Sequence, residues 1–149
     1  MELLGNFQIE TFWQLLLAAI LGAFIGVERE YKKKGAGLQT YSLVALGSCL
    51  FAVIYVVLVS GQAENFPLFG AAPEIIKAVA TGIGFIGAGV IFRQVSGPTT
   101  GLTTAAGLWV VSAIGVAAGF QLYFLAITVT ALTIVVLAGF GALEEKFFR

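Results

Sequence analysis

The feature that most constrains the fold is a series of apolar segments long enough to cross a lipid bilayer. A membrane-spanning helix needs roughly 20 predominantly apolar residues, and shorter spans are tolerated when their charged ends reach the interface. Five segments meet this requirement, at about 11–27, 41–60, 75–92, 102–119 and 120–143. We therefore expect an all-α membrane protein with five transmembrane helices, in which residues 1–149 form one domain.

The boundary between the last two spans is the weakest of the series, because only Gly119-Phe120-Gln121 offers a turn there. A single helix over 102–143 would be about 63 Å long at a rise of 1.5 Å per residue. That length is about twice the thickness of the membrane core. We therefore expect two helices joined by a tight turn.

The composition excludes several classes of function. The chain is 59% hydrophobic and 11% charged, and its eight basic residues balance its eight acidic ones, so nothing attracts nucleic acid. There is no histidine, and Cys49 is the only cysteine, which rules out an intramolecular disulfide. Ser48, Cys49 and Ser112 have no histidine to activate them as nucleophiles. We expect no enzyme activity and no cofactor.

The distribution of basic residues predicts the orientation, because short loops rich in Lys and Arg stay in the cytoplasm. Seven of the eight basic residues fall on one side: Arg29, Lys32, Lys33, Lys34, Arg93, Lys146 and Arg149. The other side carries only Lys77. The sequence therefore predicts an N-out, C-in arrangement, with the first span retained as a helix.

The third span is unusually rich in glycine, and Gly82–Gly87 matches the G-x-G-x-x-G pattern of dinucleotide-binding loops. That pattern needs a preceding strand and a soluble βαβ unit, whereas here membrane helix flanks it. At 100° per residue, the small residues fall on two opposite sides of the helix. One side holds Ala78, Gly82 and Gly89, and the other holds Ala80, Gly84 and Gly87. We expect these glycines to pack a central helix between two neighbours; exposed backbone lining a narrow polar path is the alternative.

Two pairs of spans look alike, which predicts a parallel two-helix repeat followed by a fifth helix. Gly37-Leu38-Gln39-Thr40 precedes span two and Gly101-Leu102-Thr103-Thr104 precedes span four, 64 residues apart. Gly22-Ala23 and Gly87-Ala88 lie near the ends of spans one and three, 65 residues apart. Thr40 and Thr104 would then cap two helices whose positive ends converge, either as ordinary caps or as a site for an anionic group.

Polar residues gather at the same predicted membrane level and form the candidate functional site. They are Glu28, Arg29, Gln39, Thr40, Arg93, Thr103 and Thr104. In one interpretation they anchor the helices at the interface, with Glu28 paired to Arg93. In the other, Glu28 is a proton-coupled carboxylate or a weak cation ligand, aided by hydroxyl and amide oxygens that suit Mg²⁺.

Four ordered blocks resemble the MgtC/SapB family of bacterial inner-membrane proteins. The blocks are LGAFIGVERE (21–30), AGLQTYSLVALG (36–47), GIGFIGAGVIFR (82–93) and GLTTAAGLWVVSAIGVAAG (101–119). The motif positions that carry over are Glu28, Arg29, Gly37, Thr40, Gly82, Gly84, Gly87, Gly89, Arg93, Thr103, Thr104 and Trp109. The chain departs from the family pattern at Gln39, Tyr41 and Ala78.

This resemblance implies a five-span domain linked to growth under magnesium limitation and to survival inside host cells. It also implies action through other membrane proteins, such as an ATP synthase or a phosphate transporter. Longer members carry a soluble C-terminal domain similar to an ACT fold; this chain ends at Arg149, so we expect a short member without it.

Two functions of different classes follow. The first is a non-catalytic modulator of Mg²⁺, phosphate or proton homeostasis that docks helix to helix on inner-membrane partners or on itself as a homodimer. The second is a transporter or channel for a small ion, with Mg²⁺ as a candidate.

Overall fold

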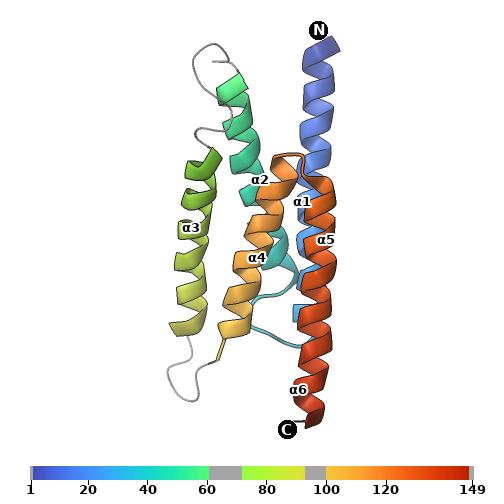
Figure 1. Cartoon of the computed structure of the whole chain (residues 1–149), viewed down its shortest axis with the longest axis vertical. Helices are drawn as coiled ribbons and strands as arrows, with labels where there is room; N and C mark the ends of the chain where they lie inside the picture. Colours follow the sequence, from blue (N-terminus) through green and yellow to red (C-terminus); the bar gives the residue numbers. More distant parts are fainter. Residues whose placement is uncertain (1, 61–71, 93–99, 148–149) are drawn as a thin grey trace.

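The computed structural model describes residues 2–60, 72–92 and 100–147, most of which are helical (Figure 1). The elements are α1 (Glu2–Tyr31), α2 (Leu38–Ser60), α3 (Ala72–Phe92), α4 (Leu102–Gly119), α5 (Tyr123–Ile134), the π-helix η1 (Val135–Phe140) and α6 (Gly141–Phe147). Because α5, η1 and α6 follow one another without a break, they form a single rod, which we call the last rod. The described residues contain five helices long and apolar enough to span a membrane and no strand, which confirms the expected all-helical, five-span class.

The turn between α4 and α5 is tight and is closed by two backbone hydrogen bonds. Gln121 adopts a left-handed backbone conformation with φ 62°. Its N–H donates to the carbonyl of Ala118 at 3.0 Å, and the N–H of Leu122 donates to Ala117 at 2.8 Å. This pair of bonds is a Schellman motif, which satisfies the last carbonyls of α4 and ends the helix. The predicted break between spans four and five is therefore confirmed, with α5 starting at Tyr123.

The two ends of the bundle differ in charge. At one end α1, α3 and α6 finish and α2 and α4 begin; we call it the basic end, because Lys32, Lys33, Lys34 and Lys146 lie there. The opposite end holds the N-terminus, the end of α2 and the α4–α5 turn (Figure 1). There the side-chain amide of Gln121 donates to Glu10 of α1 at 2.8 Å.

Helix α4 is the centre of the bundle, since it packs against α1, α2, α3 and α5. Glycines let it approach α2 closely: a Cβ added at Gly119 would lie 2.6 Å from the carbonyl oxygen of Cys49. On α1, a Cβ added at Gly22 would lie 2.6 Å from the carbonyl oxygen of Tyr41. Close backbone approach maximises dispersion contacts between membrane helices, which gain little from hydrophobicity alone.

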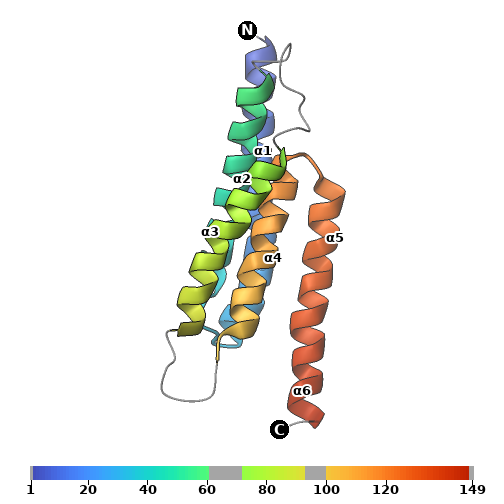
Figure 2. The same ribbon diagram turned by 60° about the vertical axis from the view of Figure 1, so that its left-hand side comes forward.

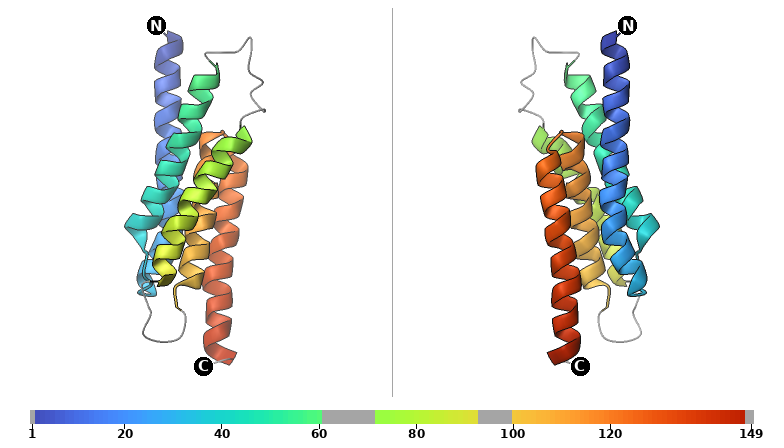
Figure 3. Two further views of the ribbon diagram at one scale, coloured as in Figure 1. Left: turned by 90° about the vertical axis from the view of Figure 1, so that its left-hand side faces the viewer. Right: turned by 90° about the vertical axis from the view of Figure 1, so that its right-hand side faces the viewer.

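The expectation that the glycine-rich third span is central is wrong for the single chain. Helix α3 is the least buried of the five spans and packs mainly on α4, with a weaker contact to α2. Figures 2 and 3 show α3 and α5 on opposite sides of α4. The glycines that bring helices together lie instead on α1 and α4, where the neighbours of Gly22, Gly26, Gly115 and Gly119 include backbone atoms.

Candidate functional site at the basic end

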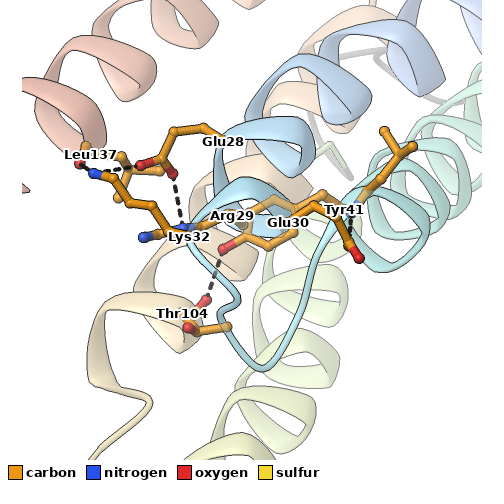
Figure 4. Close-up of polar contacts among 8 residues, drawn as sticks. Glu28, Arg29, Glu30, Lys32, Tyr41, Thr104 and Leu137 are labelled. Atoms are coloured by element: carbon orange, nitrogen blue, oxygen red, sulfur yellow. Dashed lines mark hydrogen bonds and ion pairs between the residues drawn. The ribbon is translucent and has the colours of Figure 1, made fainter.

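The end of α1 carries a group of ion pairs that ties it to the last rod (Figure 4). The Arg29 side chain is only 3% exposed, and its Nε lies 2.9 Å from Oε2 of Glu28. Lys32 Nζ lies 2.8 Å from Oε1 of Glu28 and donates a hydrogen bond to the carbonyl oxygen of Leu137 at 3.1 Å. The predicted partner of Glu28, Arg93, lies outside the described residues. Glu28 thus pairs with Arg29 of its own helix and with Lys32, which follows the helix end and links this group to the last rod.

The carbonyl that receives Lys32 belongs to the π-helix η1. A π-helix shifts backbone hydrogen bonds from i→i+4 to i→i+5 and often marks a functional position in a helix. Close packing accompanies the contact, because a Cβ added at Gly141 would lie 2.7 Å from Lys32 Nζ. From the sequence we predicted only that the charge of Lys32 helps to set the orientation of the chain. Its spacing of four residues from Glu28 could have predicted the ion pair.

The start of α2 is capped from α1 rather than from its own threonine. The Leu38 N–H donates to Oε2 of Glu30 at 3.2 Å. Thr40 is the third residue of the helix, so the prediction that it caps α2 is wrong. Gln39 is exposed at the same turn. The negative charge of the Glu30 carboxylate therefore opposes the partial positive charge at this helix N-terminus, whereas a threonine hydroxyl would supply only a neutral acceptor.

The start of α4 has no such cap. Gly101 occupies the N-cap position with φ 89° and no side-chain hydrogen bond, and Thr104 lies in the first turn, so the predicted Thr104 cap is also wrong. Thr104 is buried, and its carbonyl accepts a hydrogen bond from the hydroxyl of Tyr41 at 3.2 Å (Figure 4). Thr103 is exposed. Tyr41, which we did not predict as a site residue, thus joins α2 to α4.

The predicted polar residues that the structure describes form two groups joined through Tyr41. Lys32 links Glu28 and Arg29 to the last rod. The Thr104 carbonyl accepts a hydrogen bond from the hydroxyl of Tyr41, which lies close enough to Arg29 and Glu28 for their charges to act on it. One carboxylate between two cations leaves a net charge of +1, and among the described residues Arg29 Nη1 is buried without a hydrogen-bond partner. The described residues also hold no group of three or more Cys, Asp or Glu that could bind a metal. The excess positive charge suits an anion better than a cation.

The four glycines of α3 have different surroundings. A Cβ added at Gly87 would lie 3.5 Å from the Cβ of Ala105, an ordinary contact with α4. A Cβ added at Gly82, Gly84 or Gly89 would meet no atom of the described residues within 4 Å. Gly87 therefore packs on a neighbouring helix, and the other three leave open space in the part of the chain that the structure describes.

Two cavities border α3. The first, the apolar groove, has a volume of about 670 Å³ and runs between α2 and α3; it is lined by Thr40, Leu43, Val44, Gly47, Ser48, Phe51, Ile75, Ala78, Val79, Gly82, Ile83 and Ile86. The second, the polar cavity, has a volume of about 600 Å³ at the basic end; it is lined by Lys33, Lys34, Gly35, Ile86, Gly89, Val90, Thr100, Gly101 and Thr104. Gly84 borders neither cavity.

Comparison with known proteins places the chain in a family. The model of the MgtC family matches residues 15–146. The chain is 39% identical to protein SrpB of Synechococcus elongatus over 89% of its length. It is 43% identical, over 94% of its length, to YhiD of Escherichia coli K12, whose name proposes a magnesium transporter. It is also 40% identical to protein MgtC of Brucella abortus over 68% of its length. No solved structure matches it significantly.

The relatives differ in how much of their length the chain represents. The match covers 76% of SrpB, 65% of YhiD and 39% of the Brucella MgtC. Five apolar helices and these bacterial relatives together indicate a multi-pass membrane protein whose exposed helix surfaces contact lipid. The matched region includes four spans in full and most of the first, so the chain belongs to the MgtC family.

Proposed function

We propose that the chain is a non-catalytic modulator of ion homeostasis in a bacterial inner membrane, and that it acts by docking α3 onto another membrane protein. Its relatives in the MgtC family support the link to magnesium, since the name of one of them proposes magnesium transport. Phosphate and protons are the further ions that its resemblance to better-studied members suggests. The partner in this proposal is a membrane protein that itself moves one of these ions.

One observation carries the docking proposal: α3 has a surface that none of the other described residues covers. We call it the outward face of α3 and define it by Lys77, Thr81, Gly84 and Phe85, all of which are exposed. A Cβ at Gly84 would meet no atom within 4 Å, and Phe85 is 84% exposed. A glycine on an open membrane-facing helix lets a partner backbone approach closely. The same face also suits a second copy, so a homodimer is part of the proposal.

The docking proposal is tested by recovering bound proteins from native membranes with the wild type and with Gly84→Leu. Leucine would fill the space that a partner backbone needs, and we expect it to reduce recovery about 10-fold or more, the loss typical of disrupting close helix packing. The matched control is Gly139→Leu, because Gly139 is also exposed and open to added atoms but lies on the last rod. Equal recovery with Gly84→Leu and with the wild type would contradict the proposal.

The polar cavity favours a second candidate function, transport of a small ion. Thr100, Thr104 and the start of α4 supply oxygen and N–H groups around a space of about 600 Å³. A transporter would move ions when purified alone, so the test is flux of Mg²⁺, protons or phosphate in liposomes that contain only this protein. Transport predicts flux that Glu28→Gln abolishes. No flux of any of the three ions, with partner recovery intact, would leave the modulator as the function.

The proposal includes the N-out, C-in orientation and the two-helix repeat. Supporting the repeat, Gly22 of α1 borders Tyr41 of α2, and Gly87 of α3 borders Ala105 of α4, at matching offsets of 65 and 64 residues. Single cysteines at Lys33 and Glu74, in a Cys49→Ser background, test the orientation. We expect an impermeant thiol reagent added outside to label position 74 and to leave position 33 unmodified; the reverse pattern would overturn it.

A further inference from the structure

The apolar groove has the length of one bilayer leaflet. Its α3 wall runs from Ile75 to Ile86 and its α2 wall from Thr40 to Phe51. Each wall covers eleven residue steps, about 17 Å at 1.5 Å per residue. Half of a hydrocarbon core about 30 Å thick is about 15 Å. Gly47 and Gly82 leave the walls smooth, so the groove is shaped for an extended chain that lies parallel to the helices.

The polar cavity continues the groove at the basic end. Ile86 lines both spaces, so they meet at this side chain. Among the described residues, the charged ones that line the polar cavity are Lys33 and Lys34, and none of the lining residues in this part of the chain is acidic. The nearby carboxylate of Glu30 accepts the N–H of Leu38, and that of Glu28 is paired with Arg29 and Lys32.

The start of α4 adds to the positive character of this cavity. Gly101 and Thr104 line it, and the N-cap glycine provides no side-chain acceptor for the first N–H groups of α4. These N–H groups have no acceptor within the helix, and the helix dipole places partial positive charge there. Two ammonium groups and a helix N-terminus thus surround one end of a groove that is otherwise apolar.

We propose that the apolar groove and the polar cavity together hold one anionic phospholipid. One of its acyl chains lies along α2 and α3, and its phosphate lies between Lys33, Lys34 and the start of α4. Basic pockets between membrane helices are suited to anionic headgroups, and apolar grooves of leaflet length are suited to their chains. A second copy of this chain is a poorer occupant of the polar cavity, because a parallel two-fold dimer would bring further lysines to a site that is already positive.

The test measures lipid retained by the purified protein in native mass spectrometry after equilibration with equal amounts of dioleoyl phosphatidylglycerol and dioleoyl phosphatidylcholine. We expect the wild type to retain phosphatidylglycerol preferentially. Lys33→Gln with Lys34→Gln should reduce that preference about 5-fold for each lysine, about 30-fold in all. Glutamine removes the charge and keeps most of the side-chain length, and at residue 33, where φ is 52°, it is an unbranched side chain like the lysine it replaces. The control is Lys77→Gln with Lys146→Gln, which removes two exposed charges outside the site.

A second pair of variants tests the groove independently of charge. Gly82→Leu places a side chain inside the groove and should reduce retention of both lipids on the order of 10-fold, the effect of displacing about two methylene groups. Gly84→Leu adds the same side chain outside the groove and should leave lipid retention unchanged. Both glycines leave space for added atoms, so neither change should prevent folding.

Three results would overturn the lipid site. An unchanged phosphatidylglycerol preference in the double lysine variant would contradict binding of the headgroup by Lys33 and Lys34. Equal retention by Gly82→Leu and Gly84→Leu would contradict binding of an acyl chain in the groove. A wild type that retains neither lipid would show that the two spaces do not hold a phospholipid. Loss of partner recovery with Gly84→Leu alone would leave the lipid site intact, so the two proposals can fail separately.

Discussion

The α1–α2 pair and the α3–α4 pair run in the same directions, and α2 and α4 begin with similar sequences, Gly37–Thr40 and Gly101–Thr104, yet the helices of the first pair are packed more closely than those of the second. In the first pair, a Cβ at Gly22 or Gly26 would fall within 3 Å of α2 backbone atoms, and Glu30 caps α2. In the second pair, Gly87 makes only an ordinary contact, and α4 starts without a side-chain cap. The comparison indicates that α1, α2 and α4 form the scaffold, while α3 and the start of α4 leave surfaces free for ligands and partners.

The largest expected effect comes from making one substitution at matching positions of the two pairs. Gly22→Ala would place its Cβ 2.6 Å from a carbonyl oxygen and should cost about 3 kcal/mol of stability, because backbone cannot move aside cheaply. Gly87→Ala should be neutral or stabilise by up to about 1 kcal/mol, since its Cβ fits and alanine favours helix. SDS titration followed by circular dichroism measures both. Equal losses would mean that the pairs are equally tight.

The next effect concerns the charges that attach α1 to the last rod. Glu28→Gln leaves the buried Arg29 and the partly exposed Lys32 without their carboxylate. We expect it to lower the free energy of unfolding by about 2 kcal/mol. This is less than for a fully buried pair, because 12% of the Glu28 side chain is exposed. Partner recovery, corrected for the amount of folded protein, should not change. The control is Glu28→Leu with Arg29→Met, which should recover most of the lost stability. If Glu28→Gln alone is as stable as the wild type, the ion pairs contribute nothing.

A smaller effect is expected at the link between the two pairs. Tyr41→Phe removes the hydroxyl that donates to the Thr104 carbonyl at 3.2 Å in a buried position. The loss of one such bond should cost about 1 kcal/mol of unfolding free energy. Tyr31→Phe is the matched control, because Tyr31 is 88% exposed and should tolerate the change. The same midpoint of SDS denaturation for both variants would rule out a stabilising link.

The smallest effect distinguishes the two helix starts. Glu30→Ala removes the acceptor of the Leu38 N–H, so that α2 starts uncapped, like α4, at a cost of about 0.5 kcal/mol, the low end for an exposed cap. Glu30→Gln keeps an acceptor oxygen and should lose less. The midpoint of thermal unfolding in detergent checks the order of the three proteins. A Gln variant less stable than the Ala variant would contradict a capping role.

The number and class of the helices could be predicted from the sequence because hydrocarbon imposes one simple requirement. Every backbone N–H and C=O inside a bilayer needs a partner within the segment, so a long apolar run is a helix. That constraint acts on each segment separately, so segment length together with the turn residues Gly119-Phe120-Gln121 predicted the break between spans four and five. The glycines of α3 were identified from the sequence of their own span. The polar positions at the basic end were also identified by their level along the helices.

The lateral arrangement could not be predicted in the same way. A glycine looks the same in sequence whether a neighbour covers it, as at Gly22, or open space does, as at Gly84. The predicted threonine caps failed because Glu30, eight residues before Leu38, reaches the start of α2 first, and because α4 begins after a glycine with a left-handed backbone. Such contacts depend on which helices are adjacent, and helix adjacency is not encoded in the periodicity of one segment.

The most direct test of the central claim, that α3 presents a docking face, is site-specific photo-crosslinking in native membranes. Phe85 on α3 and Phe124 on α5 are 84% and 85% exposed, so each can carry a photoreactive phenylalanine with equal access to its surroundings. We predict that position 85 gives discrete adducts with a membrane protein or a second copy, that Gly84→Leu abolishes them, and that position 124 gives none. Identical adduct patterns from the two positions, or adducts at position 85 that persist with Gly84→Leu, would contradict the account.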